Sequence, residues 1–259
     1  MPPLRSYIPA ARESLRASLV LDPDESHHLV TVRRARVNEE IAVFNGRGSE
    51  WLCRLEKADP QGVHLSIISH RQLPELSHAI SLVQAVPKRK AWHTLITRAT
   101  ELGVSCIVPV LTDNAENRPS AADMEAKQRK WRTLAIEAAK QSQQSFIPEI
   151  LDIQSFKAFM AQVPTEALKL VASLEPNALN LRDIYLDWAQ KQSDSAQAKA
   201  IYCLIGPEGD LTAEEYALAR RAGFQAITLG QSTLKVETAA IAALSILHYE
   251  LRLNAVSPC

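Results

Sequence analysis

The chain is 259 residues long, which suits one large domain or two smaller ones. Hydrophobic residues make up 46% of it and charged residues 22%, a composition typical of a folded globular protein and not of a disordered chain. Lys and Arg together number 29, as do Asp and Glu, so the formal net charge of zero excludes a strongly basic coat for nucleic acid but not a local basic patch.

The spacing of the cysteines and the length of the apolar stretches indicate the cellular compartment. Cys53, Cys106, Cys203 and Cys259 include no closely spaced pair, so neither a structural zinc site nor a disulfide framework is expected. Reduced thiols suit a cytoplasmic protein. The N-terminus lacks the apolar core of a signal peptide, and the longest apolar stretch, at 238–247, is too short to cross a bilayer. We therefore expect a cytoplasmic protein with no membrane partner.

Short strands are predicted in the first part of the chain. Residues 41–44 form an apolar run that ends at an Asn-Gly dipeptide, a strong signal for a hairpin turn. Apolar and polar residues then alternate at 50–57 and again at 63–67. This pattern predicts a small antiparallel barrel or sheet, followed by a linker at 71–77.

From residue 79 onward, strand-like and helix-like segments alternate about five times. Strands are predicted at 79–86, 105–111, 167–174, 200–205 and 225–229, the first two of them apolar runs. Helices are predicted at 88–103, 123–144, 179–190, 212–222 and 237–251. Such alternation predicts a parallel sheet covered by helices, in which ligands bind beyond the carboxyl ends of the strands. The loops after Leu174, Ile205 and Leu229 are therefore where we expect a site.

The strongest local motif is Gly-Pro-Glu-Gly at 206–209. The common motifs of dinucleotide enzymes, P-loop proteins, serine hydrolases and zinc proteases are absent. The motif lies between a buried strand and a helix whose start carries Thr212 and Glu215 at the spacing of a capping box. Its glycines would let a ligand approach the main chain, and the helix N–H groups could donate to that ligand. The alternative interpretation is a plain strand–helix turn.

A second motif follows the next strand. That strand ends at Leu229 and Gly230, and a loop containing Lys235 leads to an apolar helix that starts at Glu237. Alone, the pattern is weak, because Glu237 could simply complement the helix dipole and Lys235 could be a solvated charge.

Together, the two loops resemble those of the RsmE family, the ribosomal RNA uridine N3-methyltransferases of the SPOUT superfamily. The family pattern contains Gly-Pro-Glu-Gly-Gly, a later strand ending in Leu-Gly, and Glu-Thr-Ala, which correspond to 206–209, 229–230 and 237–239. Ala-Thr-Glu-Leu-Gly-Val at 99–104 is a further match, as is the stretch from His to Arg at 28–34. The resemblance covers nearly the whole chain, in order.

The resemblance implies an α/β fold with two domains. A PUA-like β-barrel that binds RNA would occupy residues 1–72, and a SPOUT domain with a parallel sheet and a deep trefoil knot would occupy residues 78–259. It also implies a homodimer that uses S-adenosyl-L-methionine, needs no metal and methylates N3 of a uridine in small-subunit (16S) ribosomal RNA, free or in the small ribosomal subunit.

The resemblance further implies the residues of the site. The cofactor would be bound by Leu174, Glu175, Ile205, Gly206, Pro207, Glu208, Gly209, Leu229, Gly230, Leu234, Thr238 and Ala239. Glu237 and Lys235 are the charged candidates near these loops, and our hypothesis is that Glu237 orients the base edge or helps take its proton while Lys235 steadies negative charge on a ring oxygen. Arg5 and Arg34 fit the family pattern and are expected to contact phosphates. Two tight basic clusters add the candidates Arg33, Arg36, Lys88 and Lys90. For the clusters at 33–36 and 88–90, the alternative is a solvated charged face.

Some positions depart from the family pattern. The last glycine of Gly-Pro-Glu-Gly-Gly is Asp210 here, and Gln144, Ser232 and Lys235 stand where the family has arginines. Arginine binds phosphate through two parallel hydrogen bonds, whereas lysine acts as a point charge. The departures leave two alternatives open: a divergent RNA-binding member without methyl transfer, and a methyltransferase with another RNA target.

Overall fold

The structure is a computed structural model, and its described residues are 3–9, 17–74, 78–87, 89–115, 121–191 and 199–255. The chain divides into two compact units, Met1–Glu75 with Ile136–Ile147 and Leu76–Ala135 with Pro148–Cys259. Lys88, one of the predicted phosphate contacts, lies outside the described residues, as does the side chain of Lys90.

The N-terminal unit is built on a five-stranded sheet with the order β1-β3-β4-β5-β2. Its elements are β1 (Leu4–Tyr7), β2 (Ser18–Val20), α1 (Pro23–His27), the π-helical turn η2 (His28–Val32), β3 (Glu40–Phe44), β4 (Ser49–Lys57) and β5 (His64–Gln72). The predicted strands correspond to β3, β4 and β5 and pair antiparallel, as expected. The segments β1, β2, α1 and η2 were not predicted, because each is too short to show a hydrophobic period.

The predicted Asn-Gly turn joins β3 to β4. The Asn45 side-chain oxygen accepts hydrogen bonds from the backbone N–H groups of Arg47 at 2.8 Å and Ser49 at 3.1 Å. Gly46 has a φ of +75°, and a Cβ placed on it would lie 2.7 Å from Ile147 Cδ1. The left-handed backbone favours glycine here, and any larger residue would also require the Ile147 side chain to shift.

A buried charge network lies inside the N-terminal unit. The side chains of Arg5 and Glu50 are only 8% and 9% exposed and form an ion pair at 2.8 Å. The Arg5 guanidinium also lies 4.5 Å from the centre of the Phe44 ring. The second carboxylate oxygen of Glu50 pairs with Arg71, and the Ser145 hydroxyl donates to the first. Arg5 is therefore engaged in the interior of this unit.

Residues of the segment 136–147 complete the same unit. Lys140 forms a buried ion pair with Glu25 at 2.9 Å, and the Gln144 carbonyl accepts a hydrogen bond from Arg5 at 3.2 Å. The backbone N–H of Ile147 donates to the Gly46 carbonyl at 3.0 Å. The N-terminal unit is thus assembled from two stretches of chain that are far apart in sequence.

The C-terminal unit contains an eight-stranded parallel sheet with the order β11-β13-β10-β12-β6-β7-β8, and β9 pairs with β7. The strands are β6 (His78–Ala85), β7 (Cys106–Leu111), β8 (Glu149–Ile150), β9 (Gln154–Ser155), β10 (Leu168–Ala172), β11 (Leu179–Asn180), β12 (Lys199–Ile205) and β13 (Gln225–Thr228). The helices are α2 (Arg89–Glu101), α3 (Ala121–Ser142), α4 (Phe156–Gln162), α5 (Leu181–Lys191), α6 (Ala213–Arg221) and α7 (Val236–Ala255). The predicted alternation and the parallel sheet are confirmed, whereas β8, β9, β11 and α4 were not predicted.

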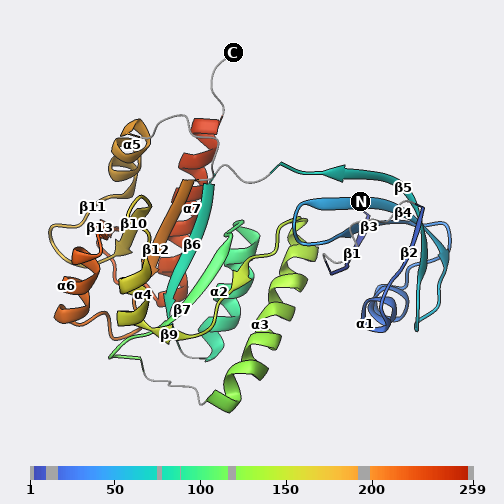
Figure 1. Cartoon of the computed structure of the whole chain (residues 1–259), viewed down its shortest axis with the longest axis horizontal. Coiled ribbons are helices and arrows are strands. Elements are labelled where there is room, and N and C mark those ends of the chain that lie inside the picture. Colours follow the sequence, from blue (N-terminus) through green and yellow to red (C-terminus); the bar gives the residue numbers. More distant parts are fainter. Residues whose placement is uncertain are drawn as a thin grey trace. The chain divides into compact units, whose positions relative to one another are not determined.

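Helices cover both faces of the parallel sheet (Figure 1). Helices α4 and α6 pack together, and α7 packs against α2, α5 and β12. The core between the sheet and helices α4 and α6 contains Val83, Val108 and Phe159, all of which are buried. Among the described residues, no helix is both long enough and apolar enough to span a membrane.

Candidate functional site

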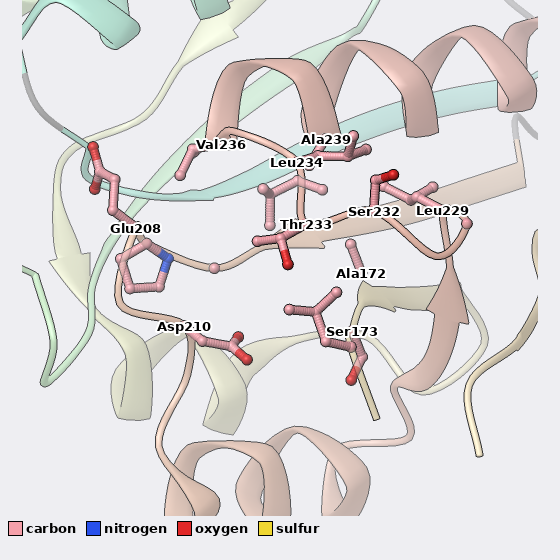
Figure 2. A pocket seen from close by; sticks show the side chains of 15 residues that line it. Ala172, Ser173, Glu208, Asp210, Leu229, Ser232, Thr233, Leu234, Val236 and Ala239 are labelled. Carbon is pink, nitrogen blue, oxygen red and sulfur yellow. The ribbon is translucent and has the colours of Figure 1, made fainter. Parts of the chain in front are cut away.

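One pocket lies at the carboxyl ends of adjacent strands in the C-terminal unit (Figure 2). It encloses about 620 Å³ of empty space, counted out to the open solvent. Its lining residues are Ala172, Ser173, Leu174, Ile205, Gly206, Pro207, Glu208, Asp210, Leu229, Gly230, Ser232, Thr233, Leu234, Val236 and Ala239. Its mainly apolar lining with a few polar side chains is typical of a site for a small organic ligand.

The sheet order explains why these loops meet. Strand β10 lies between β12 and β13, and all three run parallel, so the loops that follow them emerge at the same edge. These are the loops after Ala172, Ile205 and Thr228, which include the three places where the sequence predicts a site. Helix α7 closes one side of the pocket through Val236 and Ala239.

The loop between β12 and α6 is held by side chains outside the pocket. The Asn114 side-chain amide donates to the carbonyls of Gly209 at 3.1 Å and Asp210 at 3.0 Å. The predicted capping box is confirmed, since Thr212 and Glu215 exchange side-chain-to-backbone hydrogen bonds. Glu215 is buried and also accepts from the backbone N–H of Asp113 at 2.9 Å. The loop after β7 thus braces the loop that forms the pocket floor.

Replacing Asn114 by Ala should therefore weaken ligand binding without unfolding the protein. The change removes both hydrogen bonds to the 209–210 carbonyls, and Asn114 is itself exposed. A looser loop loses part of its preorganisation, so we expect the dissociation constant for a pocket ligand to rise about three- to tenfold. Titration calorimetry measures it, and an unchanged dissociation constant would show that the loop keeps its conformation without Asn114.

A chain of polar groups links two sides of the pocket. The Tyr216 hydroxyl donates to Asp210 Oδ1 at 2.8 Å and also hydrogen bonds with the Ser173 side chain. Burial, together with the neighbouring carboxylate of Asp210, raises the pKa of Tyr216 well above its usual value. The phenol therefore stays protonated near neutral pH and keeps its role as a donor.

Most of the predicted cofactor residues lie together around the pocket. The lining includes Leu174, Ile205, Gly206, Pro207, Glu208, Leu229, Gly230, Leu234 and Ala239. Three others are outside it. Arg220 engages both carboxylate oxygens of Glu175 at 2.9 and 3.0 Å, Gly209 packs against Asn114, and Thr238 is exposed on α7.

The two predicted catalytic residues flank the pocket without lining it. Lys235 is exposed, and Glu237 is half-buried in the first turn of α7. Their neighbours Leu234 and Val236 line the pocket instead. The roles of Glu237 and Lys235 stay predictions.

The predicted phosphate contacts fall into two groups. Arg33, Arg34 and Arg36 are all exposed, and Arg34 has a φ of +58°, an uncommon conformation for a residue other than glycine. Arg5, in contrast, is buried against Glu50. The Arg5 side chain is only 8% exposed and is paired with Glu50, so it offers little surface to a phosphate.

Six residues of the pocket lining were not predicted. They are Ala172, Ser173, Asp210, Ser232, Thr233 and Val236. Their positions beside the predicted residues in the three loops were the available signal, and Asp210 stood out as a departure from the family motif.

Comparisons with known proteins identify the family. The model of an RNA methyltransferase domain matches residues 74–248, and that of an RNA methyltransferase PUA domain matches residues 21–68. Ribosomal RNA small subunit methyltransferase E of Synechocystis sp. is 30% identical over 238 residues, which cover 91% of this chain and 74% of that protein. The protein of the same name from Mycobacterium bovis is 29% identical over 231 residues, covering 88% and 85%.

Solved structures agree with the sequence comparisons. The crystal structure of a ribosomal RNA small subunit methyltransferase E from Neisseria gonorrhoeae, bound to S-adenosyl methionine, is similar with a TM-score of 0.81 and 27% identity. That match covers 96% of this chain and 98% of the other. The chain therefore belongs to the ribosomal RNA small subunit methyltransferase E family of RNA methyltransferases.

Proposed function

We propose that this protein transfers a methyl group from S-adenosyl-L-methionine to N3 of a uridine in the 16S ribosomal RNA of the small subunit. The observation that carries the proposal is the pocket at which the three predicted loops converge. The small subunit methyltransferase E of Neisseria gonorrhoeae, a structural neighbour, is bound to S-adenosyl methionine, which supports the same cofactor for this family member.

The residues of the pocket fit this cofactor. Leu174, Leu229 and Leu234 offer apolar surface for an adenine ring, while Ser173 and Thr233 offer hydroxyl groups to polar parts of the ligand. Gly230 has a φ of +110°, and a Cβ placed on it would meet nothing within 4 Å, so the main chain there is open to a ligand. When bound, S-adenosyl-L-methionine supplies an electrophilic methyl group.

The protein's own contribution is to place the base and to manage its proton. Attack by N3 requires loss of the ring N–H proton, and the nitrogen must lie in line with the methyl group, so positioning should supply much of the rate. The base must also be unstacked or single-stranded to enter the site. In this proposal Glu237 orients the base edge or helps take the proton, and Lys235 steadies negative charge on a ring oxygen.

Replacing Glu237 by Gln tests that role. Because Glu237 does not line the pocket, cofactor affinity should stay at the wild-type value, while methyl transfer should slow about tenfold or more. Single-turnover transfer at saturating cofactor measures the step. An unchanged rate would remove Glu237 from the mechanism and leave it as a charge at the start of α7.

The exposed arginines of the N-terminal unit are proposed to contact RNA phosphates. Arg33, Arg34 and Arg36 are exposed, and the match of residues 21–68 to an RNA methyltransferase PUA domain supports an RNA-binding role for this part of the chain. Arg5 is not included, because its guanidinium is buried.

Four further features are part of the proposal. They are a division into an RNA-binding domain at 1–72 and a catalytic domain at 78–259, a trefoil knot in the catalytic domain, a homodimer, and a cytoplasmic location. The separate family matches at 21–68 and 74–248 support the division. The knot, the homodimer and the cytoplasmic location are supported by the family's resemblance to SPOUT methyltransferases.

The decisive experiment is an assay on the natural substrate. The purified protein is incubated with methyl-labelled S-adenosyl-L-methionine and small ribosomal subunits from cells that lack this gene, and the labelled nucleoside is identified by mass spectrometry. Labelled 3-methyluridine at one position is the expected result. A different labelled nucleoside would indicate another target, and no label despite binding of both cofactor and subunits would indicate an RNA-binding member without methyl transfer.

A further inference from the structure

Asp210 brings a carboxylate into the pocket. Figure 2 shows its carboxylate directed inward, whereas the carboxylate of Glu208 points away from the centre. Asp210 Oδ1 accepts hydrogen bonds from the Tyr216 hydroxyl and the Leu211 backbone N–H, both at 2.8 Å. Oδ2 forms no hydrogen bond with any described residue. One oxygen thus fixes the side chain, and the other is available to a ligand.

The backbone at Asp210 is held in an unfavourable conformation. Its φ is +60°, in the left-handed region where glycine is the usual residue. Its N–H donates to the Pro207 carbonyl at 3.0 Å, and its carbonyl accepts from Asn114 at 3.0 Å. The RsmE pattern has glycine here, which adopts this conformation without cost. An uncommon backbone conformation at a residue whose side chain points into a pocket motivates a hypothesis of function there.

The charge of the pocket identifies the partner of this carboxylate. Asp210 and Glu208 are acidic, and none of the residues that line the pocket is Lys, Arg or His. Charge is screened less in a partly enclosed site than in water, so a cationic ligand group would be favoured there. The proposed methyl donor carries two such groups, the sulfonium and the amino-acid ammonium, whereas its product retains only the ammonium.

We propose that Asp210 is the counter-charge for a cationic group of the bound methyl donor, and so a specificity-determining residue of this site. The inference rests on the proposed function. If the partner is the sulfonium, the attraction is lost when the methyl group leaves, and the spent product is held less tightly than the donor.

The test is titration calorimetry on the full chain, comparing wild type with Asp210→Asn. Asparagine tolerates the left-handed backbone, and its side-chain oxygen can still accept from Tyr216, so the change removes mainly charge. The ligands are S-adenosyl-L-methionine, S-adenosyl-L-homocysteine, which lacks the sulfonium charge, and 5′-methylthioadenosine, which lacks both charges. Glu214→Gln is the matched control, because Glu214 is exposed and outside the lining but changes the net charge equally.

We expect Asp210→Asn to weaken the binding of S-adenosyl-L-methionine about tenfold, the effect typical of a lost charge-assisted contact. The binding of 5′-methylthioadenosine should weaken less than about twofold. If the affinity for S-adenosyl-L-methionine falls more than that for S-adenosyl-L-homocysteine, the group that pairs with Asp210 is the sulfonium. If the two affinities fall equally, it is the ammonium. Equal weakening of all three ligands, or of none, would overturn the proposal. Failure of the wild-type protein to bind S-adenosyl-L-methionine would instead refute the proposed function.

Discussion

Replacing Ala239 by Phe should abolish cofactor binding, with a loss of affinity of more than about a hundredfold. Ala239 lines the pocket from the end of the first turn of α7, where its backbone N–H donates to the Lys235 carbonyl at 2.8 Å. An aromatic ring at this position would occupy the space that the ligand needs, while a helix tolerates phenylalanine at small cost. Calorimetry with S-adenosyl-L-methionine measures the loss, and methyl transfer should fall with it.

Ser245→Phe is the control for this substitution. Ser245 is an exposed residue of the same helix and is not part of the lining. The control should bind the cofactor as the wild-type protein does. Wild-type affinity in Ala239→Phe would show that the ligand does not occupy this pocket, and would contradict the proposed site directly.

Replacing Glu50 by Gln should give the largest loss of stability, about 3 kcal/mol within the N-terminal unit. The carboxylate of Glu50 faces two arginines, and Arg5 is itself only 8% exposed. Removing the charge leaves a buried guanidinium without its ionic partner, which costs more than a lost surface ion pair. Hydrogen exchange resolved by mass spectrometry would localise the effect to peptides of this unit.

The exposed residue Glu40 provides the matched control. Glu40→Gln removes a charge at the start of β3, where it is solvated, and should change stability by less than about 0.5 kcal/mol. Equal protection in the two variants would mean that the buried network contributes no more than a surface charge.

The carboxylate of Glu50 should also make the stability of the N-terminal unit sensitive to acid. Burial alone would raise the pKa of Glu50, but hydrogen bonds from Ser145 and Arg71 and the charges of Arg5 and Arg71 outweigh it and hold the pKa below its usual value. A lowered native pKa contributes stability that is present above the unfolded-state pKa and lost as the pH falls through the native one. Protection should therefore decline in acid in the wild-type protein, and that part of the decline should be missing in Glu50→Gln.

The strands and the helix start that position the pocket loops could be predicted from short stretches of sequence. The runs that became β10, β12 and β13 are short and contain apolar residues that are buried in the sheet, as is typical of parallel strands. The edge at which their loops meet follows from the parallel topology. The capping box at Thr212 was legible because its two partners are three residues apart.

Features that depend on distant partners could not be predicted. Arg5 was expected at an RNA surface, but its partner Glu50 is 45 residues away and buries it. Asp210 looked like a lost glycine until its hydrogen bond with Tyr216 placed the carboxylate in the pocket. The orientation of Glu237 likewise depends on where α7 begins, and helix boundaries are the least certain part of a sequence-based prediction.

The return of residues 136–147 to the N-terminal unit limits how this protein can be cut or recombined. The chain passes from one unit to the other three times, so neither unit is a single continuous stretch of sequence. A fragment ending at residue 75 would lack the partners that Glu25 and Arg5 find in Lys140 and Gln144. The N-terminal unit is therefore not a transplantable module, and exchanging it between family members requires replacing both of its segments together.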